Sequence, residues 1–526
     1  MVRSPLNEPM TRNQCPIMIR TRLIKELLSF LFLPFVLSVP VSNGESARNI
    51  LMISVDDMRD WTNFLGGYTG EVHTPHMDSL AARGINFTNA HCPSPVCNPS
   101  RTSVMTGLMP STTGIYDNSQ WLRPNYPDKM TLPKYFKQKG YYVVGAGKSF
   151  HHTAGNNPPD QWHDYFRFPW ADFPWTRSNK LAYPWTEWQP PPPGYPFSKV
   201  EYLRGRQEMD WGVLPRKESE YDDVLVADYA IDFLESHSGE AFFLSVGTFH
   251  PHLPWYIPKR YRDLYEEPEI HLPETPENDL VDIPAIPQRW AERHRDEMEA
   301  VKDAGEWEEA VRFYLASISF ADAQVGRVLE ALAKSPHADN TIIILWSDHG
   351  WHLGEKDHWH KSTLWEEATR VPFIIATPEM ETAGETSSAP VNIVSIFPTL
   401  IGLIEIESDI DFDGPDLGPL LANPNAPWPH ASLIDFGYGN TAVRDKRWRY
   451  IRYSDGSEEL YDHQSDPNEW KNLATNPSYQ SVKDELAKHL PSHYANYVPG
   501  KDRFVFDPDK WTFTDKDTGR VVHGKQ

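Results

Sequence analysis

The sequence predicts an α/β fold, with a large, mostly parallel β-sheet flanked by helices and a smaller C-terminal α+β subdomain. Short apolar runs rich in β-branched residues recur along the chain, and amphipathic helical segments lie between them. After about residue 425 the pattern changes to short alternating strands. Alternating strands and helices are typical of parallel sheets. A chain of 526 residues suits one large domain with a smaller companion.

The composition excludes several classes of protein. Apolar and aromatic residues make up 40% of the chain, so a large core can form and global disorder is excluded. A net charge of −23 disfavours binding of nucleic acid through a general basic surface. The three cysteines, Cys15, Cys92 and Cys97, are too few for a disulfide scaffold or a cysteine-based zinc site.

Residues 1–44 have the pattern of a secretory signal peptide. A basic segment at residues 18–26 precedes an apolar run at 27–39, and small and polar residues follow. The alternative is a membrane anchor, but the run is too short to span a bilayer and contains Pro34. We therefore expect a secreted or periplasmic protein with no membrane span once the signal has been removed.

Five apolar runs are predicted as strands of the main sheet, at residues 49–55, 141–144, 241–246, 341–346 and 371–376. Helices are predicted at residues 75–84, 132–139, 222–235 and 307–333. Polar clusters follow four of the strands, at Asp56–Asp57, Lys148–His152, His250–His252 and Asp348–His349. Because ligands bind beyond the carboxyl ends of strands in open α/β sheets, we expect these clusters to converge on one site.

Two later regions differ in character from the predicted sheet. Residues 162–197 contain five tryptophans and a run of prolines, which is typical either of a packed surface loop or of an aromatic wall for sugar rings. Short alternating strands at 448–453 and 459–462 and a helix at 479–490 predict a small antiparallel sheet. The predicted division of the chain is a signal peptide at 1–44, a main domain at 45–425 and a C-terminal subdomain at 426–526.

The most specific signal is the segment Cys97-Asn-Pro-Ser-Arg-Thr-Ser-Val-Met-Thr-Gly107. Pro99 suits the first turn of a helix and Gly107 suits its end, so Cys97 is placed at a helix N-terminus, which favours an anion. Arg101 lies one turn further on and is expected to face back towards Cys97. A cysteine in such a place is usually structural or a simple thiol nucleophile. A disulfide with Cys92 is another alternative, although it would be strained.

The whole segment resembles the signature of the type I sulfatases, with seven positions matching at fixed spacing. Further matching segments follow in the order of that family, at Val55–Trp61, Gly147–His151, Pro251–Pro254, Ser347–Gly354, Trp359–Lys361 and Leu460–Asn472. Together they are most similar to the iduronate-2-sulfatase branch. The resemblance implies an alkaline-phosphatase-like fold and a sulfuric ester hydrolase. It also implies that a formylglycine-generating enzyme oxidises Cys97 to formylglycine, whose hydrated aldehyde attacks the sulfur of a sulfate ester.

A divalent metal site is expected at the ends of two strands. Asp56 and Asp57 are adjacent carboxylates that repel each other unless a cation lies between them, and Asp348 completes an oxygen-rich site. The resemblance implies that the ion is one Ca²⁺, and that Cys97, as formylglycine, is also a ligand. His349 stands where many arylsulfatases have Asn and is either a further ligand or a hydrogen-bond donor to the sulfate.

The resemblance also assigns roles to the basic residues. Arg101 would support the hydrated formylglycine, while Lys148 and Lys361 would contact the sulfate oxygens. His151 would take a proton from formylglycine and His252 would protonate the leaving alcohol, which suits the ordinary pKa of histidine.

The remaining histidines are assigned less specifically. His250 occupies a lysine position of the human-type pattern, so its role in contacting substrate stays open. Histidines predicted to lie around the site without a direct role are His152, His352, His358 and His360.

The function predicted from the sequence is hydrolysis of a sulfate ester on a carbohydrate, such as a sulfated, uronate-containing polysaccharide or oligosaccharide. One alternative is a phosphatase or phosphonate monoester hydrolase of the same superfamily, although these use Ser or Thr as the nucleophile or a second metal. A choline-sulfatase-like enzyme is another. The last is a non-catalytic glycan-binding protein, which the complete set of site residues disfavours.

Overall fold

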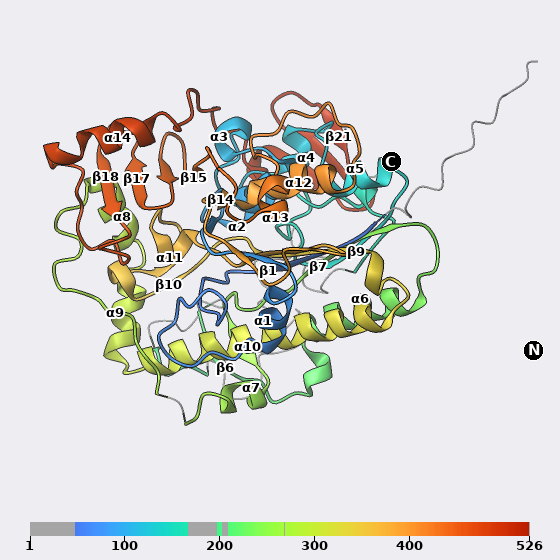
Figure 1. The fold of residues 1–526 in the computed structure, drawn as a ribbon, viewed down its shortest axis with the longest axis horizontal. Coiled ribbons are helices and arrows are strands. Elements are labelled where there is room, and N and C mark those ends of the chain that lie inside the picture. Colours follow the sequence, from blue (N-terminus) through green and yellow to red (C-terminus); the bar gives the residue numbers. More distant parts are fainter. Residues whose placement is uncertain (1–47, 167–196, 202–208, 268, 525–526) are drawn as a thin grey trace, which may run out of the picture. The chain divides into compact units, whose positions relative to one another are not determined.

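The computed structural model describes the chain except residues 1–47, 167–196, 202–208, 268 and 525–526 (Figure 1). The described residues belong to one compact unit, Ser46–Gln526. The predicted signal peptide lies outside the described residues, as does most of the tryptophan-rich segment. Trp162, at the start of that segment, is buried and donates a hydrogen bond to Oδ1 of Asn157. This tryptophan therefore packs inside the protein and does not form part of a sugar-binding wall.

An eight-stranded sheet runs through this unit in the order β13-β2-β12-β9-β1-β7-β4-β5. Its strands are β1 (Asn49–Val55), β2 (Ile85–Phe87), β4 (Tyr142–Gly147), β5 (Asp164–Phe166), β7 (Phe242–Gly247), β9 (Thr341–Ser347), β12 (Phe373–Ala376) and β13 (Thr386–Ser387). The strand β1 pairs in parallel with β7 and β9, and β4 pairs in parallel with β7 and β5. The strand β12 runs antiparallel to both of its neighbours. The predicted large, mostly parallel sheet is confirmed.

The apolar run of β1 buries both of its faces. Ile50 and Met52 belong to one hydrophobic core, whereas Leu51 and Ile53 belong to another. Because successive side chains of a strand point to opposite faces of the sheet, an unbroken apolar run is what a central strand between two layers requires.

Helices cover both faces of the sheet, which Figure 1 shows nearly edge-on. One layer contains α1 (Pro75–Ala81), α6 (Asp222–Ser236), α7 (Lys259–Asp263) and α10 (Trp307–Lys334). The other contains α2 (Cys97–Thr106), α3 (Pro110–Thr113), α4 (Leu122–Asn125), α5 (Leu132–Gln138), α12 (Ile396–Leu403) and α13 (Gly418–Ala422). The predicted helices are confirmed with small shifts at their ends. The helix expected to reach Gly84 ends at Ala81 because the next residues turn into β2.

The C-terminal part is α+β, as predicted. A four-stranded antiparallel sheet consists of β15 (Ser432–Asp435), β16 (Thr441–Arg444), β17 (Trp448–Arg452) and β18 (Glu458–Asp462). The helix α14 (Gln480–Ala487) packs on it through a small core that includes Val443, Leu460 and Leu486. A three-stranded sheet follows, with β19 (Phe504–Asp507), β20 (Thr512–Asp515) and β21 (Val521–His523).

Smaller elements complete the described structure. They are β3 (Ala90–His91), β6 (Trp211–Val213), β8 (Trp255–Ile257), α8 (Ala285–Glu292), α9 (Arg295–Asp303), β10 (His352–Leu353), β11 (Trp359–His360), α11 (Glu366–Thr369) and β14 (Val391–Asn392). The strands β10 and β11 form a short antiparallel pair just after β9. Among the described residues, we find no helix with the length and apolar character needed to cross a membrane.

Candidate active site

The register of the sheet brings the predicted site residues together at the carboxyl ends of its strands. Val55 of β1 pairs with Ser347 of β9, so Asp56 and Asp57 emerge beside Asp348. On the other side of β1, the ends of β4 and β7 lie side by side, which brings Lys148 near the loop that follows β7. The expected convergence of distant polar clusters is therefore observed.

The helix α2 presents Cys97 to this site from its first residue. Gly107 ends the helix with a φ of 70°, a left-handed conformation that favours glycine. The Oγ atom of Ser100 donates a hydrogen bond to the carbonyl oxygen of Asp348 at 2.6 Å, which ties α2 to the end of β9. Cys92 and Cys97 are both free thiols, so the alternative disulfide is not formed.

Arg101 joins the carboxylates of the two strands. Its Nη2 donates to Oδ1 of Asp56 at 2.9 Å, and its Nε donates to Oδ2 of Asp348 at 2.8 Å. All three side chains are fully buried. Burial lowers the pKa of Arg101, but the charges of Asp348 and Asp56 outweigh it, so the pKa lies above its ordinary value. From the sequence we expected the side chain of Arg101 to face Cys97. In the structure, its guanidinium makes hydrogen bonds to Asp56 and Asp348.

Two lysines lie close to the sulfur of Cys97. The Nζ atom of Lys361 lies 3.2 Å from Sγ and 2.7 Å from Oδ1 of Asp57. The Nζ atom of Lys148 lies 3.9 Å from Sγ and makes an ion pair with Asp56. Burial raises the pKa of Cys97, but the charges of Lys148 and Lys361 outweigh it and hold the pKa well below its ordinary value. The position of the sulfur is thus suited to negative charge.

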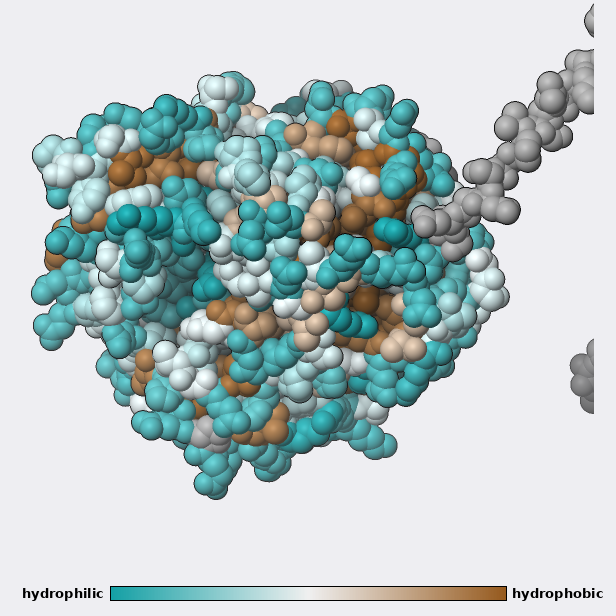
Figure 2. All heavy atoms as spheres, viewed as in Figure 1, coloured by the Kyte–Doolittle hydropathy of each residue, from teal (hydrophilic) through white to brown (hydrophobic). Residues whose placement is uncertain are grey.

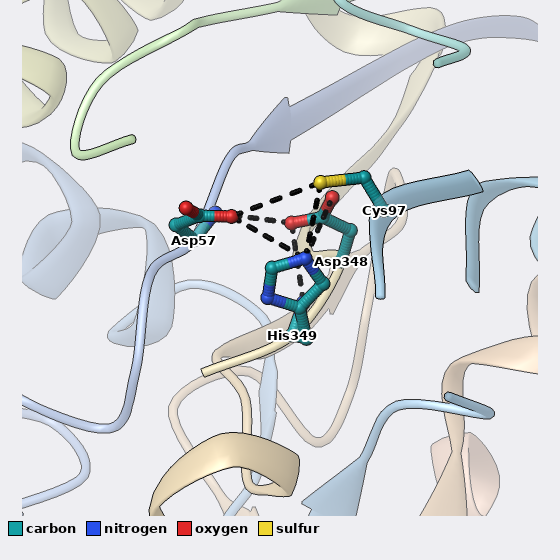
Figure 3. Close-up of side chains that lie close together, drawn as sticks. All are labelled: Asp57, Cys97, Asp348 and His349. Atoms are coloured by element: carbon teal, nitrogen blue, oxygen red, sulfur yellow. Dashed lines mark hydrogen bonds and ion pairs between the residues drawn. The ribbon is translucent and has the colours of Figure 1, made fainter. Parts of the chain in front are cut away.

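His349 points into the same space, together with Asp57, Cys97 and Asp348 (Figure 3). Its Nε2 atom lies 3.3 Å from Sγ of Cys97, 3.3 Å from Oδ1 of Asp57 and 3.6 Å from Oδ2 of Asp348. Burial lowers the pKa of His349, but the nearby carboxylates outweigh it and raise the pKa to about 9.

These side chains fit a divalent ion. The donor atoms of Asp57, Cys97, Asp348 and His349 lie within 4.8 Å of one another. Burial raises the pKa of Asp348, and the charge of Arg101 lowers it. The negative charge of Asp56 raises it further, so the pKa of Asp348 lies at about 6. The carboxylate oxygens of Asp57 and Asp348 suit a hard cation.

The two histidines with expected acid and base roles also reach the site. The Nε2 atom of His252 lies 3.7 Å from Oδ2 of Asp57. His151 is buried and hydrogen-bonds to the thiol of Cys97, which favours the thiolate. Burial lowers the pKa of His151, so its imidazole is neutral near pH 7.

His250 is buried beside Asp223. Its Nδ1 atom lies 2.7 Å from Oδ2 of Asp223, and the backbone N–H groups of Phe249 and His250 donate to the same carboxylate. Asp223 lies in the first turn of α6 and holds the loop that carries His252. The sequence analysis missed it because an acidic residue at a helix start is ordinary.

The other histidines lie around the site, and one of them contacts the backbone of Lys361. The Nε2 atom of His358 lies 2.8 Å from the carbonyl oxygen of Lys361, and the Nε2 atom of His352 lies 2.7 Å from Oγ1 of Thr363. His152 packs against His151 with ring centroids 4.5 Å apart. His360 contacts α9, as described below.

Comparison with known protein families identifies the chain. A family model described as sulfatase matches residues 48–406. The chain belongs to the sulfatase family. A second model, described as the C-terminal part of N-sulphoglucosamine sulphohydrolase, matches residues 354–496 of this sulfatase. The resemblance found in the sequence is confirmed, and the protein is a sulfuric ester hydrolase.

Relatives of this sulfatase extend over most of the chain. It is 36% identical over 476 residues to a sulfatase of Formosa agariphila, which covers 88% of this chain and 89% of the relative. It is 32% identical over 397 residues to human iduronate 2-sulfatase, covering 69% and 70% of the two chains. It is 28% identical over 503 residues to the ulvan-active sulfatase of Formosa agariphila, covering 88% and 86%.

Solved structures show the fold of this sulfatase. A protein in complex with its substrate D-glucosamine-2-N,6-O-disulfate superposes with a TM-score of 0.64 at 23% identity, covering 84% of this chain and 96% of that chain. A phosphonate monoester hydrolase from Silicibacter pomeroyi superposes with a TM-score of 0.67 at 21% identity, covering 84% and 94%. The predicted fold class is confirmed, and the fold alone does not separate sulfatases from phosphonate hydrolases.

Proposed function

We propose that this sulfatase hydrolyses a sulfate ester on a sulfated, uronate-containing polysaccharide or oligosaccharide, through a formylglycine made from Cys97. The observation that supports it most is the charge around Sγ, where the Nζ atoms of Lys361 and Lys148 lie at 3.2 and 3.9 Å. A sulfate ester is an anion, and fixed cations beside its sulfur stabilise the charge that develops as the ester bond breaks.

Each residue of the site then has a role. The formylglycine supplies the hydroxyl that attacks sulfur. Lys148 and Lys361 hold sulfate oxygens, while Arg101 keeps Asp56 and Asp348 in place. His252 protonates the leaving alcohol, which leaves the sulfo group on one oxygen of the formylglycine hydrate. His151, which is neutral near pH 7, then accepts the proton of the second hydroxyl, so that the C–O bond to the sulfate breaks, sulfate leaves and the aldehyde is restored.

The metal is proposed to be a single Ca²⁺. The ligands would be Asp56, Asp57, Asp348, His349 and the oxygen that replaces the sulfur of Cys97. Three carboxylates make the site rich in hard oxygen donors, which favours calcium over softer ions. Its charge would add to that of the lysines and help to neutralise the sulfate group.

A charged carbohydrate is favoured by the relatives and by a cleft that contains basic residues. Iduronate 2-sulfatase and an ulvan-active sulfatase carry such substrates in their names. A cleft of about 620 Å³ is lined by Arg59, which follows Asp57 closely in the chain, and by Arg370, Lys446 and Arg447. Figure 2 shows a hydrophilic hollow in the region where Figure 1 places α11, whose Glu366 and Glu367 also line the cleft. Such a cleft suits further sugars of an anionic chain.

The cellular location and the maturation step follow from the same proposal. The leader pattern of residues 1–44 indicates export to the periplasm or the medium, where polysaccharides are encountered. A formylglycine-generating enzyme would act on Cys97 before or during that export.

The experiment that tests this function is a comparison of substrates with the enzyme produced together with a formylglycine-generating enzyme. The panel contains a 2-O-sulfated uronate oligosaccharide, choline sulfate and a phosphonate monoester. We expect the highest kcat/KM with the oligosaccharide, since it fills the cleft as well as the sulfate site. A higher kcat/KM with choline sulfate, or with the phosphonate, would overturn the proposal in favour of the corresponding alternative.

A further inference from the structure

Outside the active site, two imidazoles and one carboxylate meet beside the segment that carries Lys361. His294 directly precedes α9, Glu297 lies in the first turn of α9, and His360 ends β11. The Nδ1 atom of His294 lies 2.8 Å from Oε2 of Glu297, and the Nε2 atom of His360 lies 2.9 Å from the same oxygen. The three donor atoms lie within 4.8 Å of one another.

Local structure explains why these side chains meet. Residues three positions apart at a helix start lie on the same side, which places His294 beside Glu297. His360 has a φ of 87°, in the left-handed region that a residue with a side chain rarely adopts. Its ring packs on Trp351 with centroids 4.6 Å apart, and this packing directs the ring toward α9.

We propose that His294, Glu297 and His360 bind a divalent transition-metal ion of the zinc class. Two imidazole nitrogens and one carboxylate oxygen are a donor set that zinc takes with three protein ligands, and a water then fills the fourth position. The side chains of His294 and His360 are 21% and 19% exposed and that of Glu297 is 7% exposed, so a water can reach the ion. The nitrogen donors distinguish this site from the oxygen-rich calcium site.

The protonation states of the ligands agree with this site. Burial lowers the pKa of His360 to about 3, so its ring is neutral and can bind a metal. Burial raises the pKa of Glu297, but the hydrogen bonds from His294 and His360 outweigh it and hold the pKa below its ordinary value. The carboxylate is therefore ionised.

A second cluster that could hold a metal ion, formed by Glu366, His463 and Glu469, differs because its carboxylates have an arginine partner. There, Nε of Arg449 lies 2.5 Å from Oε1 of Glu469, so a guanidinium supplies positive charge within the cluster. At the three-residue site, two imidazoles contact Oε2 of Glu297, and imidazoles are metal ligands. A bound ion would join α9 to β11, and the residue after β11 is Lys361.

The test is a titration of the whole purified enzyme with ZnCl₂, in buffer with excess calcium to keep the active-site carboxylates occupied. Isothermal calorimetry and metal analysis after gel filtration report the stoichiometry. We expect the native enzyme to bind one equivalent of zinc and the Glu297→Gln enzyme to bind none there. Glu299→Gln, an exposed neighbour on α9, is the matched control and should bind zinc as the native enzyme does.

Cobalt provides an independent readout. CoCl₂ at the same site should give the visible absorption of a four-coordinate ion, and His294→Gln should abolish it in a protein whose circular dichroism is unchanged. His294 is only partly buried at a helix end, so this variant serves if Glu297→Gln fails to fold. No zinc bound by the native enzyme, or equal zinc in native and variant enzymes, would overturn the proposal and leave a hydrogen-bonded cluster.

Discussion

The Nζ atom of Lys361 lies 3.2 Å from the Sγ atom of Cys97, although 264 positions separate the two residues in the sequence. Burial lowers the pKa of Lys361, but the charges of Asp57 and Cys97 outweigh it, so the lysine stays charged. The protein therefore fixes a cation, before substrate arrives, beside the side chain that carries the nucleophile in the proposed reaction. Such preorganisation costs no rearrangement when the substrate becomes more negative.

Replacing this cation should reduce catalysis strongly. Lys361→Met keeps much of the stem and removes the charge, so we expect kcat/KM for a sulfate ester to fall roughly 10²–10³-fold, as for loss of one preorganised donor. Lys334→Met, which removes an exposed lysine of α10, is the control and should have little effect. A kcat/KM within a few-fold of the native value for Lys361→Met would show that this cation does not contact the reacting group.

Arg101 is expected to contribute to stability as well as to the site. Arg101→Gln leaves Asp56 and Asp348 buried without their shared guanidinium, and breaking such a buried pair costs about 3–5 kcal/mol in the free energy of unfolding. Urea unfolding in the presence of a calcium chelator measures this loss. The exposed pair of Lys334 and Glu330 offers a control, since Lys334→Gln should leave the midpoint almost unchanged. Equal midpoints for the two variants would contradict the structural role.

The pH dependence of kcat should reflect the burial of His151. Because burial lowers its pKa below 6.5, and a base acts in its neutral form, kcat should rise with pH along a limb whose midpoint lies below pH 6.5. His151→Gln should lower kcat and remove this limb from the profile. Steady-state rates between pH 4 and pH 8 test this, and a limb centred above 6.5 that persists in the variant would exclude His151 as the base.

The cationic cleft should matter for long substrates and not for short ones. Lys446 is exposed and lines the cleft, so Lys446→Ala should raise KM for a sulfated polysaccharide about two- to five-fold, the range expected for one exposed charge pair. Its kcat, and its KM for a sulfated monosaccharide, should not change. Lys488→Ala, at the exposed residue that follows α14, is the control. An equal rise in KM for both substrates would place the effect in the sulfate site and not in the cleft.

Much of the fold could be predicted because its central strands are long, apolar and followed by polar residues. The run Asn49–Val55 is a strand from end to end, and the residues after it reach the site as expected. The last two strands at one side of the sheet, β2 and the edge strand β13, have three and two residues, which are too few to show a period of two. The contacts of Arg101 could not be predicted from the sequence either. They depend on the pairing of β9 with β1, which brings Asp348 beside Asp56.

The supporting residues were harder to predict. Asp223 and Glu297 each lie in the first turn of a helix, where acidic residues are common for reasons of local electrostatics. Their contacts to His250 and His360 are formed only when loops distant in sequence fold against those helices. Because an acidic residue in the first turn of a helix is already explained by the helix dipole, its presence in the sequence does not indicate a contact with a distant histidine.

The most direct test of the whole account is the mass of the peptide that contains Cys97, from enzyme produced together with a formylglycine-generating enzyme. The account predicts the mass of an aldehyde in place of the thiol, and Cys97→Ala, which cannot be converted, should lack sulfatase activity. An intact thiol at Cys97 in fully active enzyme would contradict the account, because the attacking hydroxyl would then be missing.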